Sequence, residues 1–273
     1  MSQYRPQNFS FLPPIVKNLL IINILLYLLT IALGGRLGIN LYDILGLHYW
    51  QASLFRPYQW ITYMFMHSTP SHLLFNMFAL WMFGAVLENR WGPKRFLFYY
   101  IACGLGAAAL HFGIAYYQIN PVVAQIDQFV DNPTFENLSN FNANNDILIG
   151  YKKFNNIYQQ FQLQPQDNAL SLEASKFMQE YKDYFLNMHV VVGASGAIFG
   201  LLLAFGMLFP NAYIYLYFLF PIKAKYFVIL YGLAELLTGI RNNPGDNVAH
   251  FAHLGGMLAG FLLISYWRRR GNL

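Results

Sequence analysis

Six runs of apolar residues, nearly free of charge, constrain the fold of this chain most. Ile15–Leu33 is about as long as the ~20 residues that a helix needs to cross a bilayer. Only 11% of all residues are charged, whereas about 25% is usual in soluble domains. The sequence therefore predicts an all-α polytopic membrane protein with a bundle of six transmembrane helices. The other five runs are Ser71–Leu87, Phe96–Tyr117, Gly193–Phe209, Tyr226–Ile240 and Asn247–Trp267.

The segments between these runs divide the chain into four parts. Residues 1–14 form a polar N-terminal tail, and residues 15–117 hold the first three membrane helices. Within that part, residues 34–70 are mixed and aromatic, which is typical of a loop that lies in the membrane interface. Residues 118–187 are a polar insertion, and residues 188–273 hold the last three helices and a basic tail. Residues 211–224 are expected to form an interfacial connector between the fourth and fifth helices.

The insertion contains a predicted amphipathic helix over Ala169–Leu186, where apolar residues recur at helical spacing with charged residues between them. Such a face needs a partner, and the insertion leads directly into the fourth apolar run. A lid or a docking element for substrates is therefore one interpretation. A tolerated, partly disordered loop is the other, because long surface insertions cost little closure entropy. The apolar positions of the pattern are Leu170, Leu172, Phe177, Tyr181 and Tyr184.

The charges indicate membrane topology and not nucleic-acid binding, although the net charge is +5. Eight of the twelve acids fall in the insertion, and the rest of the chain holds thirteen bases and four acids, mostly in short loops. With six spans, ten of these bases lie on one side, which the positive-inside rule makes cytoplasmic together with both termini. The insertion, the 34–70 loop and the 241–247 turn are then extracytoplasmic. The ten bases are Arg5, Lys17, Arg90, Lys94, Arg95, Lys223, Lys225, Arg268, Arg269 and Arg270.

Two further features concern processing and redox chemistry. A cleaved signal peptide is the alternative interpretation of the first apolar run. The length of the run, the charge-poor start and the lack of an Ala-x-Ala-like site favour a retained helix. The single cysteine, Cys103, lies in an apolar run, so an intramolecular disulfide framework is excluded.

The stretch Gly193-Ala194-Ser195-Gly196 opens the fourth apolar run. At the start of a helix several backbone N–H groups lack partners inside the helix and the helix dipole is positive, which suits developing negative charge. Ser195 is therefore a candidate nucleophile. The alternative is a packing surface, because small residues let membrane helices approach closely.

The sixth run carries His253 on the same helical face as Gly256 and Gly260. The spacing Gly256-xxx-Gly260 allows a neighbouring helix to come close, and Gly196-xxx-Gly200 offers a matching surface. We therefore expect the fourth and sixth helices to meet and to bring His253 against the serine. A structural role for the histidine between helices is the alternative.

His72 and Asn76 lie four residues apart on the second run and project from one helical face. Together with the backbone N–H of Ser195 they supply donors for an oxyanion, while Ser195 and His253 supply a nucleophile and a base. Neither Glu235 nor Asp246 has a spacing that requires a triad, so a Ser–His dyad is the simpler interpretation. Glu235 is interpreted as a buried helix-packing residue.

No metal or cofactor is expected. His67 and His72 are five residues apart, which does not put both on one face. His250 and His253 form an i, i+3 pair that could bind a metal, but the chain has neither a His-Glu-x-x-His sequence nor a cysteine cluster. The remaining histidines, His48, His111 and His189, are interpreted as structural.

At these residues the chain resembles the rhomboid family of intramembrane serine proteases. Gly193-x-Ser195-Gly196 resembles the nucleophile motif, and Ala252-His253-x-x-Gly256-x-x-x-Gly260 resembles the helix of the catalytic histidine. His67-x-x-x-x-His72-x-x-x-Asn76 is similar to the second-helix motif, whose last two residues serve the oxyanion hole, and Glu88-x-Arg90 also fits. Phe199 matches an aromatic residue that packs on the histidine ring.

The resemblance implies a six-helix, bacterial type of rhomboid with a long insertion between helices 3 and 4. It implies an endopeptidase that cleaves in or near transmembrane segments of membrane proteins through an acyl-enzyme. The expected partners are transmembrane substrates and the lipid bilayer, without nucleic acid, and the expected location is a bacterial inner membrane. A catalytically idle rhomboid-like factor that binds membrane proteins is the first alternative, and a channel or transporter is the second.

Overall fold

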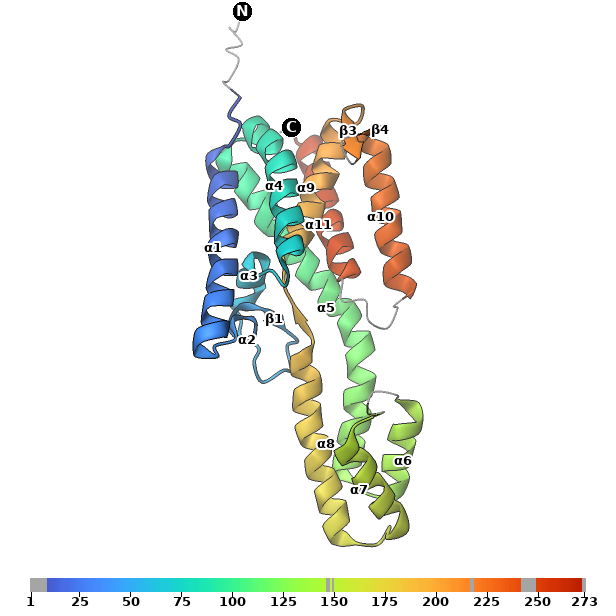
Figure 1. Cartoon of the computed structure of the whole chain (residues 1–273). Coiled ribbons are helices and arrows are strands. Elements are labelled where there is room, and N and C mark those ends of the chain that lie inside the picture. Colours follow the sequence, from blue (N-terminus) through green and yellow to red (C-terminus); the bar gives the residue numbers. More distant parts are fainter. Residues whose placement is uncertain (1–8, 146–147, 149, 217–218, 242–248, 272–273) are drawn as a thin grey trace, which may run out of the picture. The chain divides into compact units, whose positions relative to one another are not determined.

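A computed structural model describes residues 9–145, 148, 150–216, 219–241 and 249–271. The expected 242–247 part of the turn, with Asp246 and the predicted start of the last span, lies outside these residues, as do residues 1–8 of the tail. The chain divides into two compact units (Figure 1). The bundle unit comprises Met1–Leu47, Arg56–Phe112 and Val190–Leu273, and the insertion unit comprises His48–Phe55 and Gly113–His189.

Each of the six predicted apolar runs forms a helix. These helices are α1 (Pro14–Leu37), α4 (Pro70–Trp91), α5 (Pro93–Asp131), α9 (Ser195–Leu208), α10 (Ala224–Arg241) and α11 (His250–Arg269). Within the described part of the chain, α1, α4 and α5 are long and apolar enough to cross a membrane, and α9 is a shorter apolar helix. The chain is therefore an all-α membrane bundle.

A buried carboxylate near the end of α4 holds the first turn of α1. Glu88 of α4 is almost fully buried, and its two carboxylate oxygens accept hydrogen bonds from the backbone N–H groups of Ile15 and Val16 at 2.9 and 2.8 Å. These N–H groups lie in the first turn of α1, where no helical partner exists. A carboxylate there also favours the positive end of the helix dipole. Glu88 therefore joins the end of α4 to the start of α1.

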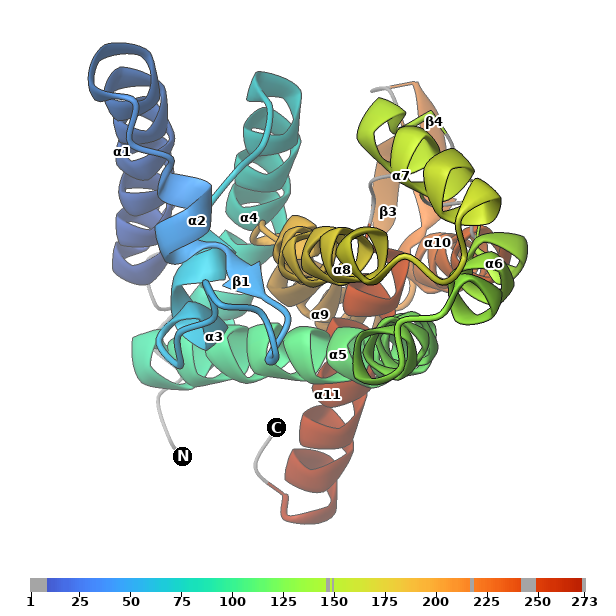
Figure 2. The same cartoon turned by 90° about the horizontal axis from the view of Figure 1, so that it is seen from below.

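Helix α9 is the central element of the bundle unit. It packs against α4, α10 and α11, and in the view of Figure 2 it lies among these three helices. Nine of its fourteen residues are buried. A helix surrounded on several sides needs apolar residues all round, which explains its nearly uniform apolar sequence. The position of α9 places its N-terminal residue, Ser195, among side chains of the neighbouring helices.

The loop over residues 34–70 folds into short elements: α2 (Leu41–Leu45), β1 (Leu47–His48), α3 (Gln59–Thr62) and the 3₁₀ turn η1 (Tyr63–Phe65). Side chains hold these pieces to one another. The Thr62 hydroxyl donates to the Leu45 carbonyl at 2.7 Å, and the Tyr42 hydroxyl donates to the His67 carbonyl at 2.9 Å. The loop is therefore ordered and leads into α4, although its residues His48–Phe55 belong to the insertion unit.

The connector after α9 differs from the prediction, because it contains a β-hairpin. Strands β3 (Tyr213–Leu216) and β4 (Phe220–Lys223) pair antiparallel, with Tyr213 opposite Lys223. The alternation of aromatic and branched residues in β3 favours a strand. A second sheet of two residues per strand pairs β1 with β2 (Val190–Val191), which ends two residues before Gly193.

The insertion unit is helical and has its own core. It contains the last part of α5, which extends to Asp131 and not only to Tyr117 as predicted, and the helices α6 (Phe135–Asn144), α7 (Lys152–Leu163) and α8 (Asn168–Met188). Helix α8 confirms the predicted amphipathic helix. The predicted face is only partly correct, however, because Phe177 and Tyr181 are buried whereas Leu172 and Tyr184 are exposed.

Candidate active site

The backbone in front of Ser195 is fixed by a glycine and a hydrogen bond. Gly193 has φ +127°, a conformation that other residues rarely adopt. Its N–H donates to the carbonyl of Tyr63 at 2.9 Å. A Cβ atom added to Gly193 would lie 2.8 Å from Nε2 and Cε1 of His72 and 3.6 Å from Oγ of Ser195. The turn therefore presents the serine hydroxyl next to the His72 ring.

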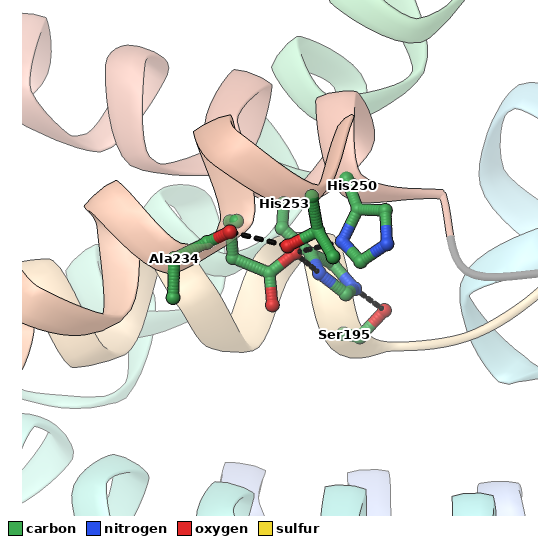
Figure 3. Close-up of polar contacts among 6 residues, drawn as sticks. Ser195, Ala234, His250 and His253 are labelled. Atoms are coloured by element: carbon green, nitrogen blue, oxygen red, sulfur yellow. Dashed lines mark hydrogen bonds and ion pairs between the residues drawn. The ribbon is translucent and has the colours of Figure 1, made fainter. Parts of the chain in front are cut away.

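Ser195 and His253 are in direct contact, as the expected meeting of α9 and α11 requires. Oγ of Ser195 lies 2.9 Å from Nε2 of His253, and Figure 3 marks this contact with a dashed line. His253 is buried, with 8% of the residue's surface exposed, whereas Ser195 is partly exposed. The two side chains have the geometry of a nucleophile and its base.

Glycines allow α9 and α11 to approach this closely. A Cβ atom on Gly256 would lie 1.8 Å from the carbonyl oxygen of Gly196, and one on Gly200 would lie 3.1 Å from the carbonyl oxygen of Gly256. One turn further along the same face of α11, a Cβ atom on Gly260 would lie 2.2 Å from the hydroxyl of Tyr99, which donates to the carbonyl of Gly200 at 2.9 Å. The predicted glycine surfaces thus form a backbone-to-backbone contact just below the serine.

The ring of His253 is held on its face and at its second nitrogen. Phe199, one turn after Ser195, stacks on it with ring centroids 4.1 Å apart and an angle of 7° between the planes. Nδ1 of His253 lies 2.8 Å from Oε2 of Glu235 on α10, and Nδ1 of His250 lies 2.7 Å from the same oxygen. The spacing of the sequence predicted a Ser–His dyad with Glu235 as a packing residue, but in the structure this carboxylate joins the Ser195–His253 pair.

His72 and Asn76 lie on the face of α4 that approaches this turn. Thr69 caps α4, since its hydroxyl accepts from the N–H of His72 at 3.1 Å, and Nδ1 of His72 lies 3.2 Å from the Ser68 hydroxyl. Nδ2 of Asn76 is buried and has no hydrogen-bond partner among the described residues. Buried donors are almost always paired, so an unpaired amide in a candidate active site is available for a ligand oxygen.

Three other histidines make contacts with residues outside the Ser195–His253 pair. His67 is buried, and its ring centroid lies 5.0 Å from that of His72. Burial, helped by the charge of His72, lowers the pKa of His67 to about 4, so His67 is neutral near pH 7. In the insertion unit, Nδ1 of His48 lies 3.3 Å from the carbonyl oxygen of Asn187, and Nδ1 of His189 lies 2.6 Å from that of Phe185.

Three side chains here could also serve as metal ligands. One atom each from Glu235, His250 and His253 lies within 4.8 Å of the others, so the acid joins the histidine pair that the sequence left open for a metal. Hydrogen bonds from the two rings to one carboxylate oxygen account for the same arrangement. Two signals in the sequence could have drawn attention to Glu235 and His250, namely an acid inside a membrane span, which by default marks function, and the i, i+3 spacing of the histidines. Neither signal shows that these side chains contact one another.

Comparisons with known proteins agree with these motifs. The protein-family model described as the rhomboid domain matches residues 54–123 and 169–270, well over half of the chain. An uncharacterized mitochondrial rhomboid protein of Schizosaccharomyces pombe is 29% identical over 235 residues, which are 81% of this chain and 55% of that protein. The chain thus spans about half the length of this curated relative. With its membrane-spanning helices and its match to the rhomboid domain, the chain is an integral membrane protein that belongs to the rhomboid family.

Proposed function

We propose that this chain is an intramembrane serine endopeptidase that cleaves peptide bonds in or near transmembrane segments of other membrane proteins. The observation that carries the proposal is the 2.9 Å contact between Oγ of Ser195 and Nε2 of His253 at the start of a buried helix. Rhomboid membership supports the reaction class. The substrates follow from the location of the serine, because only chains that enter the membrane reach it.

In the reaction, Oγ of Ser195 attacks the carbonyl carbon of the scissile bond while its proton passes to Nε2 of His253. The protonated histidine then gives this proton to the leaving amine, and an acyl-enzyme remains. His253 then removes a proton from a water molecule, whose oxygen bonds to the acyl carbon. The bond from this carbon to Oγ of Ser195 breaks, the acid is released, and Oγ takes the proton back from His253. No metal or cofactor takes part in these steps.

The negative oxygen of the tetrahedral intermediate needs donors on the side of Ser195 away from the histidine. The backbone N–H of Ser195 belongs to the first turn of α9, where the helix provides no acceptor and its dipole favours an anion. We assign the unpaired Nδ2 of Asn76 and the ring edge of His72 beside Gly193 as the side-chain donors for this oxygen. Fixed donors of this kind stabilise the transition state more than the substrate.

The length of α9 indicates how deep the reaction takes place. Fourteen residues at about 1.5 Å each give a helix of about 21 Å, shorter than the ~30 Å hydrocarbon core of a bilayer. If α9 ends at one membrane face, Ser195 therefore lies below the other face. The polar side chains around it, among them His72 and Asn76, provide an environment in which water is stable.

The excess of bases at both termini and in the 88–95 turn orients the protein with these parts in the cytoplasm. The insertion then lies on the opposite side, in the periplasm of a bacterial inner membrane. The S. pombe relative is named as mitochondrial, so a mitochondrial membrane is the alternative host. Cleavage of the insertion by an external protease in sealed, oriented vesicles tests the orientation.

The proposal is tested by comparing the purified parent protein with Ser195→Ala, His253→Ala and the double variant in proteoliposomes that contain a transmembrane substrate. We expect cleavage by the parent protein alone. Because residues that act as a unit are not additive, the double variant should be no worse than either single variant. A parent protein that binds the substrate but never cleaves it would instead support the idle, membrane-protein-binding alternative.

A further inference from the structure

Glu235 is a buried acid whose environment demands an explanation. It lies in the middle of α10 with 7% of its surface exposed. A carboxylate away from water is costly unless it is hydrogen-bonded. Its Oε2 atom receives two contacts, from Nδ1 of His253 at 2.8 Å and from Nδ1 of His250 at 2.7 Å. Both partners belong to α11, one turn apart.

A role of Glu235 in helix packing would explain a hydrogen bond to one of these histidines but not to both. His250 alone would join α10 to α11. The additional bond goes to His253, whose other nitrogen contacts the hydroxyl of Ser195. Polar residues inside membrane spans mark function by default, and here the acid lies in line with the reacting groups.

The hydrogen-bond chemistry determines which form His253 adopts. An ionised carboxylate only accepts hydrogen bonds, so Nδ1 of His253 must carry the proton that it donates to Glu235. In the neutral ring Nε2 is then unprotonated and accepts from the hydroxyl of Ser195. This is the tautomer that a general base needs.

We propose that Glu235 is the third member of a Ser195–His253–Glu235 triad, a positioning residue that acts through His253. The inference rests on the proposed protease function. Glu235 holds the ring in the reactive tautomer and stabilises the imidazolium that forms when Ser195 gives up its proton. The proton stays on His253 until it passes to the leaving amine, and the carboxylate does not take it.

His250 supports the triad from the side. Its bond to Oε2 holds the carboxylate in place, and its ring stands at 88° to that of His253 with centroids 6.4 Å apart. The ring of Phe199 stacks on the face of the His253 ring and so keeps the imidazole from turning out of its plane. Among the residues that the structure describes, the other titratable groups around the triad are His72 of α4 and Tyr231 of α10, which packs on Phe199.

The test compares Glu235→Gln with Glu88→Gln, a second buried carboxylate of the same bundle that lies at the start of α1. Glu235→Gln keeps the size of the side chain but removes the charge and can present its NH₂ group to the ring. We expect kcat/KM to fall roughly a hundredfold to ten-thousandfold, as for loss of a triad acid. The acid limb of the pH profile should also move to lower pH, because the imidazolium loses its counter-charge.

The controls separate positioning from structure. Glu88→Gln should lower the melting temperature and leave the acid limb at the parent pH. His250→Gln should reduce kcat/KM less than Glu235→Gln, and Glu235→Asp, which keeps the charge, should restore the parent position of the acid limb. A folded Glu235→Gln variant with the parent rate and pH profile would overturn the triad.

A measurement on the unaltered protein covers the case in which Glu235→Gln does not fold. ¹⁵N spectra of histidine-labelled parent protein, with His253→Gln for assignment, should show His253 protonated at Nδ1 and unprotonated at Nε2. The opposite tautomer would contradict the proposal. Failure of the protease function itself is distinguishable, because the parent protein would then not cleave, whereas failure of the triad leaves cleavage dependent on Ser195 but independent of Glu235.

Discussion

In the bundle unit the helices that carry Ser195 and His253 meet through glycines, whereas in the insertion unit the helices meet through aromatic side chains. A Cβ atom on Gly256 would lie 1.8 Å from the backbone of Gly196. The insertion unit instead buries large rings, such as those of Phe129, Phe141 and Phe161, in its own core.

The difference follows from what drives association in each setting. Apolar side chains gain little by leaving lipid, so membrane helices associate through close packing of small residues. In water the burial of aromatic surface is itself favourable. The insertion unit also has capped helices, with Asp167 accepting from the N–H of Ala169 at 2.7 Å, and an ion pair between Lys182 and Asp127. The contact between α9 and α11 at the site therefore depends on glycines, which have no side chain, whereas the insertion unit depends on large aromatic side chains in its core.

The largest effect on turnover is expected for Gly256→Leu. The new side chain has no space against Gly196, so α9 and α11 must separate and Ser195 must move away from His253. We expect cleavage to be lost and the stability to fall by about 1–3 kcal/mol or more. Gly113→Ala in α5 is the matched control, because no atom lies within 4 Å of its added Cβ. Equal cleavage by both variants would contradict the claim that α9 and α11 must meet through glycines at the site.

The next effect concerns the unpaired amide of Asn76. Asn76→Ala should cut kcat about a hundredfold to a thousandfold, the usual cost of one oxyanion donor, while Ser195 remains slowly reactive toward a serine probe. Phe75→Ala, its neighbour with 70% of its surface exposed, should retain the parent kcat. Turnover of Asn76→Ala at the parent rate would remove this residue from the site.

A smaller effect is expected for Phe199→Leu. The substitution keeps an apolar residue on α9 but removes the stack on His253, and such ring pairs contribute about 0.5–1.5 kcal/mol. Turnover should therefore fall roughly twofold to tenfold, with the Ser195–His253 contact retained. Steady-state cleavage rates check this expectation, and a loss as large as that of His253→Ala would mean that the stack holds the whole site together.

The smallest effect on the chemistry is expected when residues 122–184 are replaced by a short Gly/Ser linker. We propose that the insertion acts as a lid or a docking element, because only six residues separate the end of α8 from Ser195 along the chain. Labelling of Ser195 by a small probe should then keep its parent rate, whereas cleavage of full-length membrane substrates should change in rate or position. Unchanged cleavage of every substrate tested would exclude both roles.

The same contrast explains what the sequence could predict. Apolar runs and glycine spacing indicated six helices and the meeting of α9 with α11, because both signals are local. The partners of His253 on its other side were not predictable, since the contact of Glu235 with His253 depends on how α10 packs against α11. The exposed positions Leu172 and Tyr184 illustrate a related limit: spacing indicates a helical face but not its exact centre, which the neighbouring helices decide.

The most direct test of the central claim is covalent labelling with a fluorophosphonate, followed by mass spectrometry of the modified peptide. We predict one adduct on Oγ of Ser195 in the parent protein and its loss in His253→Ala, because the hydroxyl needs the base to react. Ser171 of α8, whose hydroxyl donates to the Pro133 carbonyl at 2.8 Å, serves as an internal control and should stay unmodified. A folded parent protein without an adduct, or with equal labelling of Ser195 in His253→Ala, would contradict the account.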